Sequence, residues 1–238
     1  MGKAFAQAGT NAARDNHGFG AAPQRVFVFC CLIFAMTASP TVNHFDARAR
    51  DWDKRPISQQ LADVAERLLA RLELSAQAHV LDFGAGTGLL ATAVAPRVAK
   101  VTALDTSAGM LQVLREKGVA NIETVQQDIF AGLPGRFDAI VSCMALHHVA
   151  DTAALLRVFA DLLAPGGQIA LVDLYAEDGS FHGDNAAKGV HHLGFEPEAL
   201  QALARQAGLE QVAMQPLASI QRETGDYPLF LLTGRKPA

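Results

Sequence analysis

Cysteine is scarce in this chain of 238 residues, and its placement excludes two common kinds of protein. The chain has three cysteines, and two of them, Cys30 and Cys31, are adjacent. Three thiols do not make the disulfide framework of a small secreted domain, and their spacing does not match a metal-binding set. We therefore expect a protein of a reducing compartment and predict a cytoplasmic location.

An excess of one charge is also lacking. Lysine and arginine together number 20 and aspartate and glutamate 24, which gives a net charge of −4 and a pI of about 6.0. Without a basic excess, nothing in the composition favours binding to a phosphate backbone, and we predict no nucleic-acid partner. Half of the residues are hydrophobic, so a chain of this length can bury the core of one ordinary domain.

The apolar run Val26–Met36 is shorter than the roughly 20 residues that a membrane-spanning helix needs. We therefore predict no stable membrane span. Its length, with Arg25 before it, fits the core of a signal peptide, whereas a translation start at Met36 is the alternative that we favour. We predict that residues 1–38 are a disordered or non-native extension and that residues 39–238 form the folded domain.

The folded part is organised around one short stretch. His79–Phe83 is an apolar run typical of a buried parallel strand. Three glycines follow at alternate positions: Gly84, Gly86 and Gly88. A helical pattern then begins at Leu89 and is stopped by Pro96. A strand, a glycine turn and a helix in this order form the nucleotide-binding start of a doubly wound α/β sheet.

The residues around the glycines indicate the kind of ligand. A dinucleotide site would have its third glycine one position later, where this chain has Leu89. Asp82 would repel a diphosphate but suits a ligand with a cationic end. S-adenosylmethionine has an ammonium and a sulfonium group and no phosphate. The pattern Asp82-x-Gly84-x-Gly86-x-Gly88 after a strand resembles the first motif of the class I S-adenosylmethionine-dependent methyltransferases.

The resemblance extends along the folded chain, from about Phe45 to Leu232. The segments FDAIVSCMALHHV and LAPGGQIALVDL resemble later motifs of the same family. The loop FHGDNAAKGVHHLGF, with its His-His-x-Gly-Phe pattern, is similar to one in the ubiquinone/menaquinone C-methyltransferase-like group. The resemblance to the family implies a doubly wound, Rossmann-like sheet of seven mostly parallel strands, with helices on both faces and a terminal antiparallel hairpin. It also implies a helical lid over residues 43–73, in which Trp52 closes over the donor.

Two further acids lie at the ends of predicted strands. Asp105 ends the strand Lys100–Asp105, and Asp128 lies near the end of the predicted strand Ile122–Phe130. Since ligands of such sheets bind at the carboxyl ends of the strands, we expect Asp105 to hydrogen-bond ribose and Asp128 to hydrogen-bond adenine. The predicted donor-binding residues are Asp82, Gly84, Ala85, Gly86, Gly88, Asp105, Thr106, Met110, Asp128, Ile129 and Cys143.

Histidines follow the predicted central strand. His147 and His148 are candidates for a general base, because the ordinary pKa of histidine suits proton removal near neutral pH. The alternative is that they cap the next helix or pack under the lid. His191 and His192 are predicted to form part of the substrate wall.

The loop histidines also raise the question of a metal ion. His182, Asp184, His191 and His192 carry suitable ligand atoms, but their spacing matches no compact site. The sequence analysis therefore predicts no metal.

These observations predict methyl transfer from S-adenosylmethionine to a small-molecule acceptor, such as a phenol or a quinone precursor, by in-line displacement. Two alternatives remain from the sequence: an NAD-type oxidoreductase on a similar sheet, and a binding module that holds S-adenosylmethionine without catalysis. The expected assembly is a monomer or a homodimer.

Overall fold

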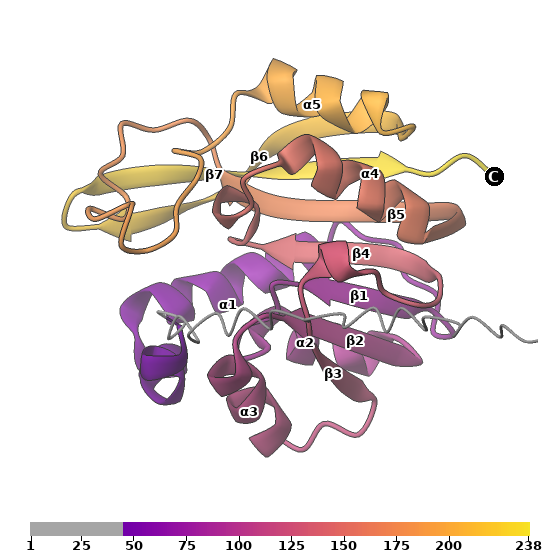
Figure 1. The fold of residues 1–238 in the computed structure, drawn as a ribbon, viewed down its shortest axis with the longest axis horizontal. Helices are drawn as coiled ribbons and strands as arrows, with labels where there is room; N and C mark the ends of the chain where they lie inside the picture. The colour runs from indigo at the N-terminus through magenta and orange to yellow at the C-terminus, as the bar shows by residue number, and fades with distance from the viewer. Residues whose placement is uncertain (1–44) are drawn as a thin grey trace, which may run out of the picture. The chain divides into compact units, whose positions relative to one another are not determined.

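The computed structural model describes residues 45–238, so the predicted extension 1–38 lies outside the described residues. The described chain forms one sheet with the strand order β3-β2-β1-β4-β5-β7-β6 (Figure 1). The strands are β1 (His79–Phe83), β2 (Lys100–Asp105), β3 (Ile122–Gln126), β4 (Phe137–Cys143), β5 (Leu163–Leu174), β6 (Glu210–Arg222) and β7 (Gly225–Arg235).

The pairing of the strands confirms the predicted topology. Strands β1 to β5 pair in parallel, whereas β7 pairs antiparallel with both β5 and β6. Strands β6 and β7 are the predicted terminal hairpin. The order reverses between β1 and β4, and ligands of doubly wound sheets bind outside the carboxyl ends of the strands at such a switch point.

Helices cover both faces of the sheet. The α-helices are α1 (Pro56–Leu69), α2 (Leu89–Val94), α3 (Ala108–Glu116), α4 (Thr152–Leu162) and α5 (Pro197–Gln206). The short 3-10 helices are η1 (Asp46–Lys54), η2 (Ala95–Arg97), η3 (Ile129–Ala131) and η4 (Leu146–His148). Within the described chain, no helix is long and apolar enough to cross a membrane.

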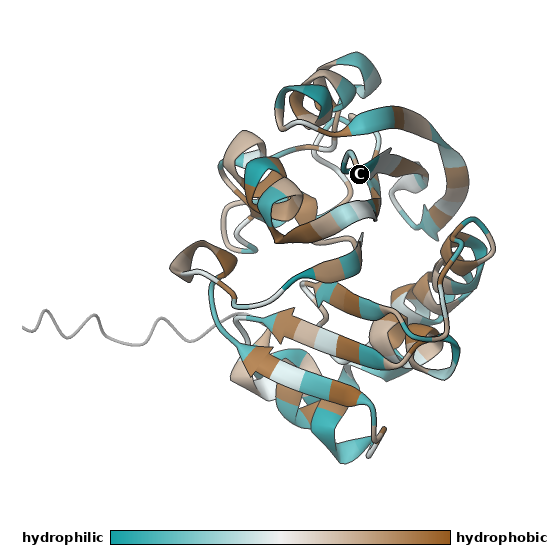
Figure 2. Ribbon diagram, turned by 90° about the vertical axis from the view of Figure 1, so that its right-hand side faces the viewer, coloured by the Kyte–Doolittle hydropathy of each residue, from teal (hydrophilic) through white to brown (hydrophobic). Residues whose placement is uncertain are grey.

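Two apolar layers hold these helices to the sheet. Helices α1, α2 and α3 pack on one face, where Leu68, Leu90 and Leu111 belong to one buried cluster. Helices α4 and α5 pack on the other face through a cluster that contains Phe159 and Leu200. Figure 2 shows hydrophobic residues along the central strands, which are buried on both faces as parallel strands usually are.

The sequence prediction for the third strand is wrong at its carboxyl end. The strand was expected over Ile122–Phe130, but β3 ends at Gln126. The reason is local: the Asp128 carboxylate accepts a hydrogen bond from the backbone N–H of Phe130 at 2.9 Å and thereby caps η3. Asp128 therefore lies in the connection just beyond the strand.

Candidate active site

A cavity of about 520 Å³ opens at the carboxyl ends of β1, β2 and β4, and its volume lies in the range of small-molecule sites. Ten of the predicted donor-binding residues line it: Asp82, Gly84, Ala85, Gly86, Asp105, Thr106, Met110, Asp128, Ile129 and Cys143. Trp52 and His148 line it as well. Gly88, His147, His191 and His192 lie outside this lining.

The glycine turn brings the backbone close to the cavity. Gly84, Gly86 and Gly88 all have positive φ, at 67°, 55° and 82°, which side chains rarely adopt. A Cβ at Gly84 would lie 2.4 Å from the Cβ of Ala145, and one at Gly88 would lie 2.2 Å from Leu114. A Cβ at Gly86 would meet no described atom within 4 Å. A side chain at Gly84 or Gly88 would therefore collide with a neighbouring residue. The absence of a side chain at Gly86 instead leaves open space at the cavity.

Asp82 is a buried carboxylate at the cavity wall. Its side chain is 1% exposed, and its Oδ2 has no hydrogen-bond partner among residues 45–238. Burial raises the pKa of Asp82 to about 8, with a small further rise from the neighbouring charge of Asp105 and an opposing effect from a backbone hydrogen bond of Ala91. A buried carboxylate oxygen without a partner is costly, so the site suits a ligand that brings a cationic group to Oδ2.

Asp105 links the end of β2 to the glycine turn. Its Oδ2 accepts a hydrogen bond from the backbone N–H of Gly86 at 2.7 Å, and its Oδ1 accepts one from Ser107 at 2.8 Å. Burial raises the pKa of Asp105, while these N–H donors partly oppose that effect. A backbone hydrogen bond from Thr106 also reaches this carboxylate. A carboxylate offers about four lone-pair sites, so it can still accept from a ligand hydroxyl.

The other wall of the donor side is apolar. Met110 from α3 and Ile129 from η3 are 2% and 3% exposed, and both line the cavity. Cys143 stands at the end of β4, where burial raises the pKa of its thiol well above the usual range. The protonated thiol is therefore a packing group and not a nucleophile.

The segment before α1 covers the cavity and is fastened to the donor side. Asp46 Oδ1 accepts hydrogen bonds from Ser107 Oγ at 2.5 Å and from the backbone N–H of Gly109 at 2.8 Å. Asp53 accepts one from Thr87 Oγ1 at 2.5 Å. These contacts hold η1 against the glycine turn and the start of α3.

Aromatic side chains of this lid face the histidines. The Phe45 ring contacts Trp52 edge to face with centroids 5.7 Å apart, and it contacts His148 in the same way at 5.3 Å. All three side chains line the cavity. Phe45 and Trp52 of the predicted lid thus lie at the same end of the cavity as His148.

His147 and His148 have different surroundings. His147 is 1% exposed, and its Nδ1 donates to Asp173 Oδ1 at 2.7 Å. His148 is half-buried, and its Nδ1 donates to the backbone oxygen of Gly189 at 3.0 Å. Burial and the nearby His147 lower the pKa of His148 to about 4, so its ring is neutral at pH 7 and keeps a lone pair on Nε2.

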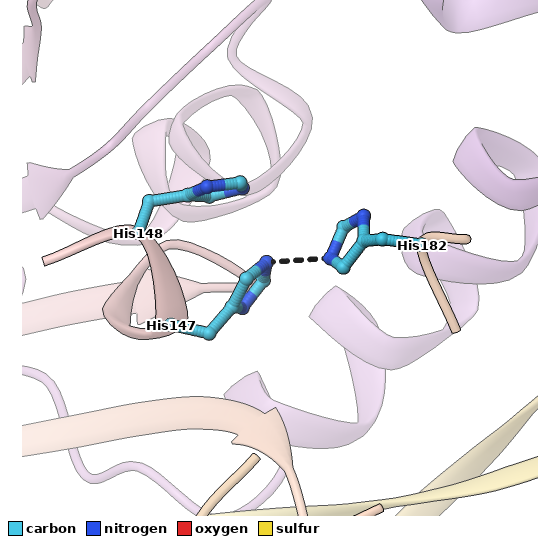
Figure 3. A group of neighbouring side chains, drawn as sticks. All are labelled: His147, His148 and His182. Atoms are coloured by element: carbon cyan, nitrogen blue, oxygen red, sulfur yellow. Dashed lines mark hydrogen bonds between the residues drawn. The ribbon is translucent and has the colours of Figure 1, made fainter. Parts of the chain in front are cut away.

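A third histidine joins this pair from the connection between β5 and α5. The Nε2 of His182 forms a hydrogen bond with the Nε2 of His147 at 3.0 Å. Figure 3 marks this contact with a dashed line. The sequence grouped His182 with Asp184, His191 and His192, whereas the structure brings it to His147 and His148.

His191 and His192 hold the connecting loop in place. Their backbone N–H groups donate to the carbonyl oxygen of His147 at 2.9 and 3.1 Å. The His192 ring donates to the backbone oxygen of Val149 at 2.9 Å. These contacts anchor the loop behind His147 and do not direct the two rings into the cavity.

Four residues of the site received no individual role from the sequence: Phe45, Asp46, Asp53 and Asp173. His182 was considered there, but with other partners. Asp173 had a usable signal, because it is an acid inside the otherwise apolar strand β5 and its side chain is fully buried. The two lid acids gave no such signal, since their partners lie far away in the sequence.

Comparison with known proteins identifies the family. Residues 52–214 match the model of a methyltransferase domain. A ubiquinone biosynthesis O-methyltransferase of Xanthomonas euvesicatoria is 37% identical over 162 residues, which are 61% of this chain and 67% of that protein. An uncharacterized methyltransferase of Schizosaccharomyces pombe is 31% identical over 149 residues, 55% of this chain and 52% of that protein.

Solved structures support the fold. A putative methyltransferase in complex with the Haloferax volcanii Trm112 activator has a TM-score of 0.71 at 22% identity, over 82% of this chain and 99% of that one. The structure of DhpI in complex with S-adenosylhomocysteine has a TM-score of 0.63 at 24% identity. The match covers 82% of this chain and 95% of DhpI.

The family match does not favour the NAD-type oxidoreductase that the sequence left as an alternative. The residues at the cavity fit a cationic, phosphate-free nucleoside, as the orphaned Asp82 carboxylate indicates. The chain therefore belongs to the methyltransferase domain family, as a class I methyltransferase that uses S-adenosylmethionine.

Proposed function

We propose that this enzyme methylates a hydroxyl oxygen of a small aromatic acceptor, such as a phenolic quinone precursor. Two observations support this choice. Relatives with 34–37% identity are named ubiquinone biosynthesis O-methyltransferases. The end of the cavity under the lid is aromatic and apolar, with the His148 ring among its lining residues.

Donor binding in this proposal uses the residues around the glycine turn. Asp82 faces the cationic methionine part, and the open space at Gly86 lets the donor approach the backbone. Asp105 accepts hydrogen bonds from the ribose hydroxyls. Asp128 accepts from the adenine amine, while Ile129 and Met110 pack on the ring. When bound, S-adenosylmethionine supplies an activated methyl group on a sulfonium.

The chain's own contribution to the reaction is alignment, exclusion of water and removal of a proton. The lid rings of Phe45 and Trp52 enclose the acceptor and hold its hydroxyl in line with the methyl carbon. With the donor held by Asp82 and Asp105, attack by a lone pair of the acceptor oxygen would form the C–O bond, and the electron pair of the broken C–S bond would stay on sulfur. The hydroxyl becomes strongly acidic as its oxygen gains positive charge, so the neutral His148 ring suffices to accept the proton at Nε2.

His147 has another role in the proposal. It does not line the cavity, and its ring is fixed by Asp173 and lies with its centroid 4.1 Å from that of His148. We assign it as a positioning residue, because it can act on the acceptor only through the ring of His148.

The proposal depends mainly on one observation: the imidazole of His148 lines the cavity beside the aromatic rings of Phe45 and Trp52. Replacing His148 by Ala should lower kcat for a phenolic acceptor by about 10²–10⁴-fold. The binding of S-adenosylhomocysteine, measured by calorimetry, should stay close to that of the wild type. Unchanged kcat would exclude His148 as proton acceptor.

A panel of phenols, quinone precursors and amines tests the wider proposal. Turnover of phenols identifies an oxygen acceptor, and turnover confined to amines would refute it. Tight binding of S-adenosylhomocysteine with no turnover of any acceptor would favour the non-catalytic binding module.

A further inference from the structure

The three histidines next to the cavity form a compact group with a common centre. His147 and His148 come from η4, and His182 comes from the loop after β5. One ligand nitrogen of each ring lies within 4.8 Å of those of the other two. Figure 3 shows His182 facing the other two rings across the space between them.

Hydrogen bonds on the far side of two rings fix how they face this centre. His147 donates from Nδ1 to the buried carboxylate of Asp173, and His148 donates from Nδ1 to the carbonyl oxygen of Gly189. A neutral ring that donates from Nδ1 has its lone pair on Nε2. Histidines that bind metals almost always donate their other N–H to a carboxylate or a carbonyl in this way.

The distances fit a small ion. Zinc binds imidazole nitrogen at about 2.0–2.1 Å, so two nitrogens on one tetrahedral ion lie about 3.3 Å apart. The Nε2 atoms of His147 and His182 are 3.0 Å apart, joined by a hydrogen bond whose proton the ion would displace. No two of the three ligand nitrogens are more than 4.8 Å apart. Each pair therefore needs to approach by at most about 1.5 Å to reach the separation of about 3.3 Å expected on the ion. His182 is flanked by Gly183, a residue with positive φ in the connecting loop.

We propose that His147, His148 and His182 bind one divalent transition-metal ion of the zinc class. Imidazole suits this class of ion, and three protein ligands leave the fourth position of a tetrahedral ion for water. Asp173, fully buried behind His147, supplies a negative charge and orients the ligand ring.

The proposed metal site is a separate property from the proposed methyl transfer, although the two share His148. The Nε2 lone pair of His148 serves either the ion or the proton of the acceptor, so a bound ion blocks the proton transfer proposed above. Binding of the ion is measured without turnover, and its outcome is therefore separate from that of the proposed function.

The test uses the full-length protein after removal of metals with a chelator. Calorimetry with Zn²⁺ should give one ion per chain, and Co²⁺ should give the intense visible absorption of a four-coordinate site. His182→Ala should weaken Zn²⁺ binding beyond the roughly 10–100-fold loss that is typical of an outer-shell partner. His148→Ala, on a different element, should do the same.

His191→Ala is the matched control, because this ring is exposed and lies outside the group. It should bind Zn²⁺ as the wild type does, and all variants should bind S-adenosylhomocysteine equally. Equal affinity of the wild type and His182→Ala, or an equal loss in His191→Ala, would overturn the proposal. The proposal would also be overturned by a weak Co²⁺ spectrum typical of a six-coordinate ion. Loss of Zn²⁺ binding on replacing Cys30 and Cys31 by Ser would overturn it as well.

Discussion

The carboxylate of Asp105 accepts a hydrogen bond from the backbone N–H of Gly86 at 2.7 Å, and so joins the end of β2 to the glycine turn after β1. The same carboxylate accepts from Ser107 at the start of α3. One side chain thus shapes the donor side of the cavity from two adjacent strands.

Replacing Asp105 by Ala removes this acceptor and the proposed contact to the ribose. The affinity for S-adenosylhomocysteine should fall by about 1–3 kcal/mol, which is the usual effect of losing a charged hydrogen bond. Calorimetry measures it, and Asp161→Ala on the exposed surface of α4 is the control. An unchanged dissociation constant would remove Asp105 from the ribose site.

A comparison of alanine variants at Gly86 and Gly118 separates the effect of backbone strain from that of a collision with the ligand. Both have positive φ, and a Cβ at either meets no described atom within 4 Å, but only Gly86 lines the cavity. Gly86→Ala and Gly118→Ala should each lower the free energy of unfolding by about 1–2 kcal/mol. Only Gly86→Ala should weaken S-adenosylhomocysteine binding. Equal binding by both variants would show that the donor does not approach this turn.

The raised pKa of Asp82 predicts pH-dependent binding of the donor. Below its pKa of about 8 the ligand-free carboxyl holds a proton, and a cationic ligand lowers that pKa by favouring the charged form. Binding then releases the proton, so the affinity for S-adenosylmethionine should increase between about pH 5.5 and 7.5, by at most about tenfold per pH unit. Asp82→Asn should abolish this dependence. A pH profile equal to that of the wild type would contradict the assignment.

Asp46 and Asp51 test how the lid is fastened. Asp46→Ala removes the acceptor of Ser107 and Gly109, and should lower the free energy of unfolding by about 1–3 kcal/mol while raising KM for the donor. Within residues 45–238, Asp51 forms an exposed ion pair with Lys54 of the same helix at 3.0 Å, so Asp51→Ala should change little. Denaturant unfolding and initial rates measure both effects; if the two variants behave alike, the lid is not held by Asp46.

The sheet, the glycine turn and the acids at the ends of the strands could all be predicted from the sequence. Their signals are local: an apolar run makes a buried strand, and a glycine with positive φ makes the turn that follows. Asp82 and Asp105 stand at strand ends, so the parallel pairing of β1 with β2 was enough to bring them to one cavity.

The contacts of the histidines and of Asp46 and Asp53 could not be predicted from the sequence, because they depend on how distant segments pack. His147 and His182 are 35 positions apart, and Asp46 and Gly109 are 63 apart, so no helical or strand period relates them. From the sequence, His147 and His148 are equal candidates for a general base, yet packing buries the first against Asp173 and leaves the second at the cavity. Neighbours in sequence point to different surroundings because the backbone turns between them, and that turn depends on contacts made by distant parts of the chain.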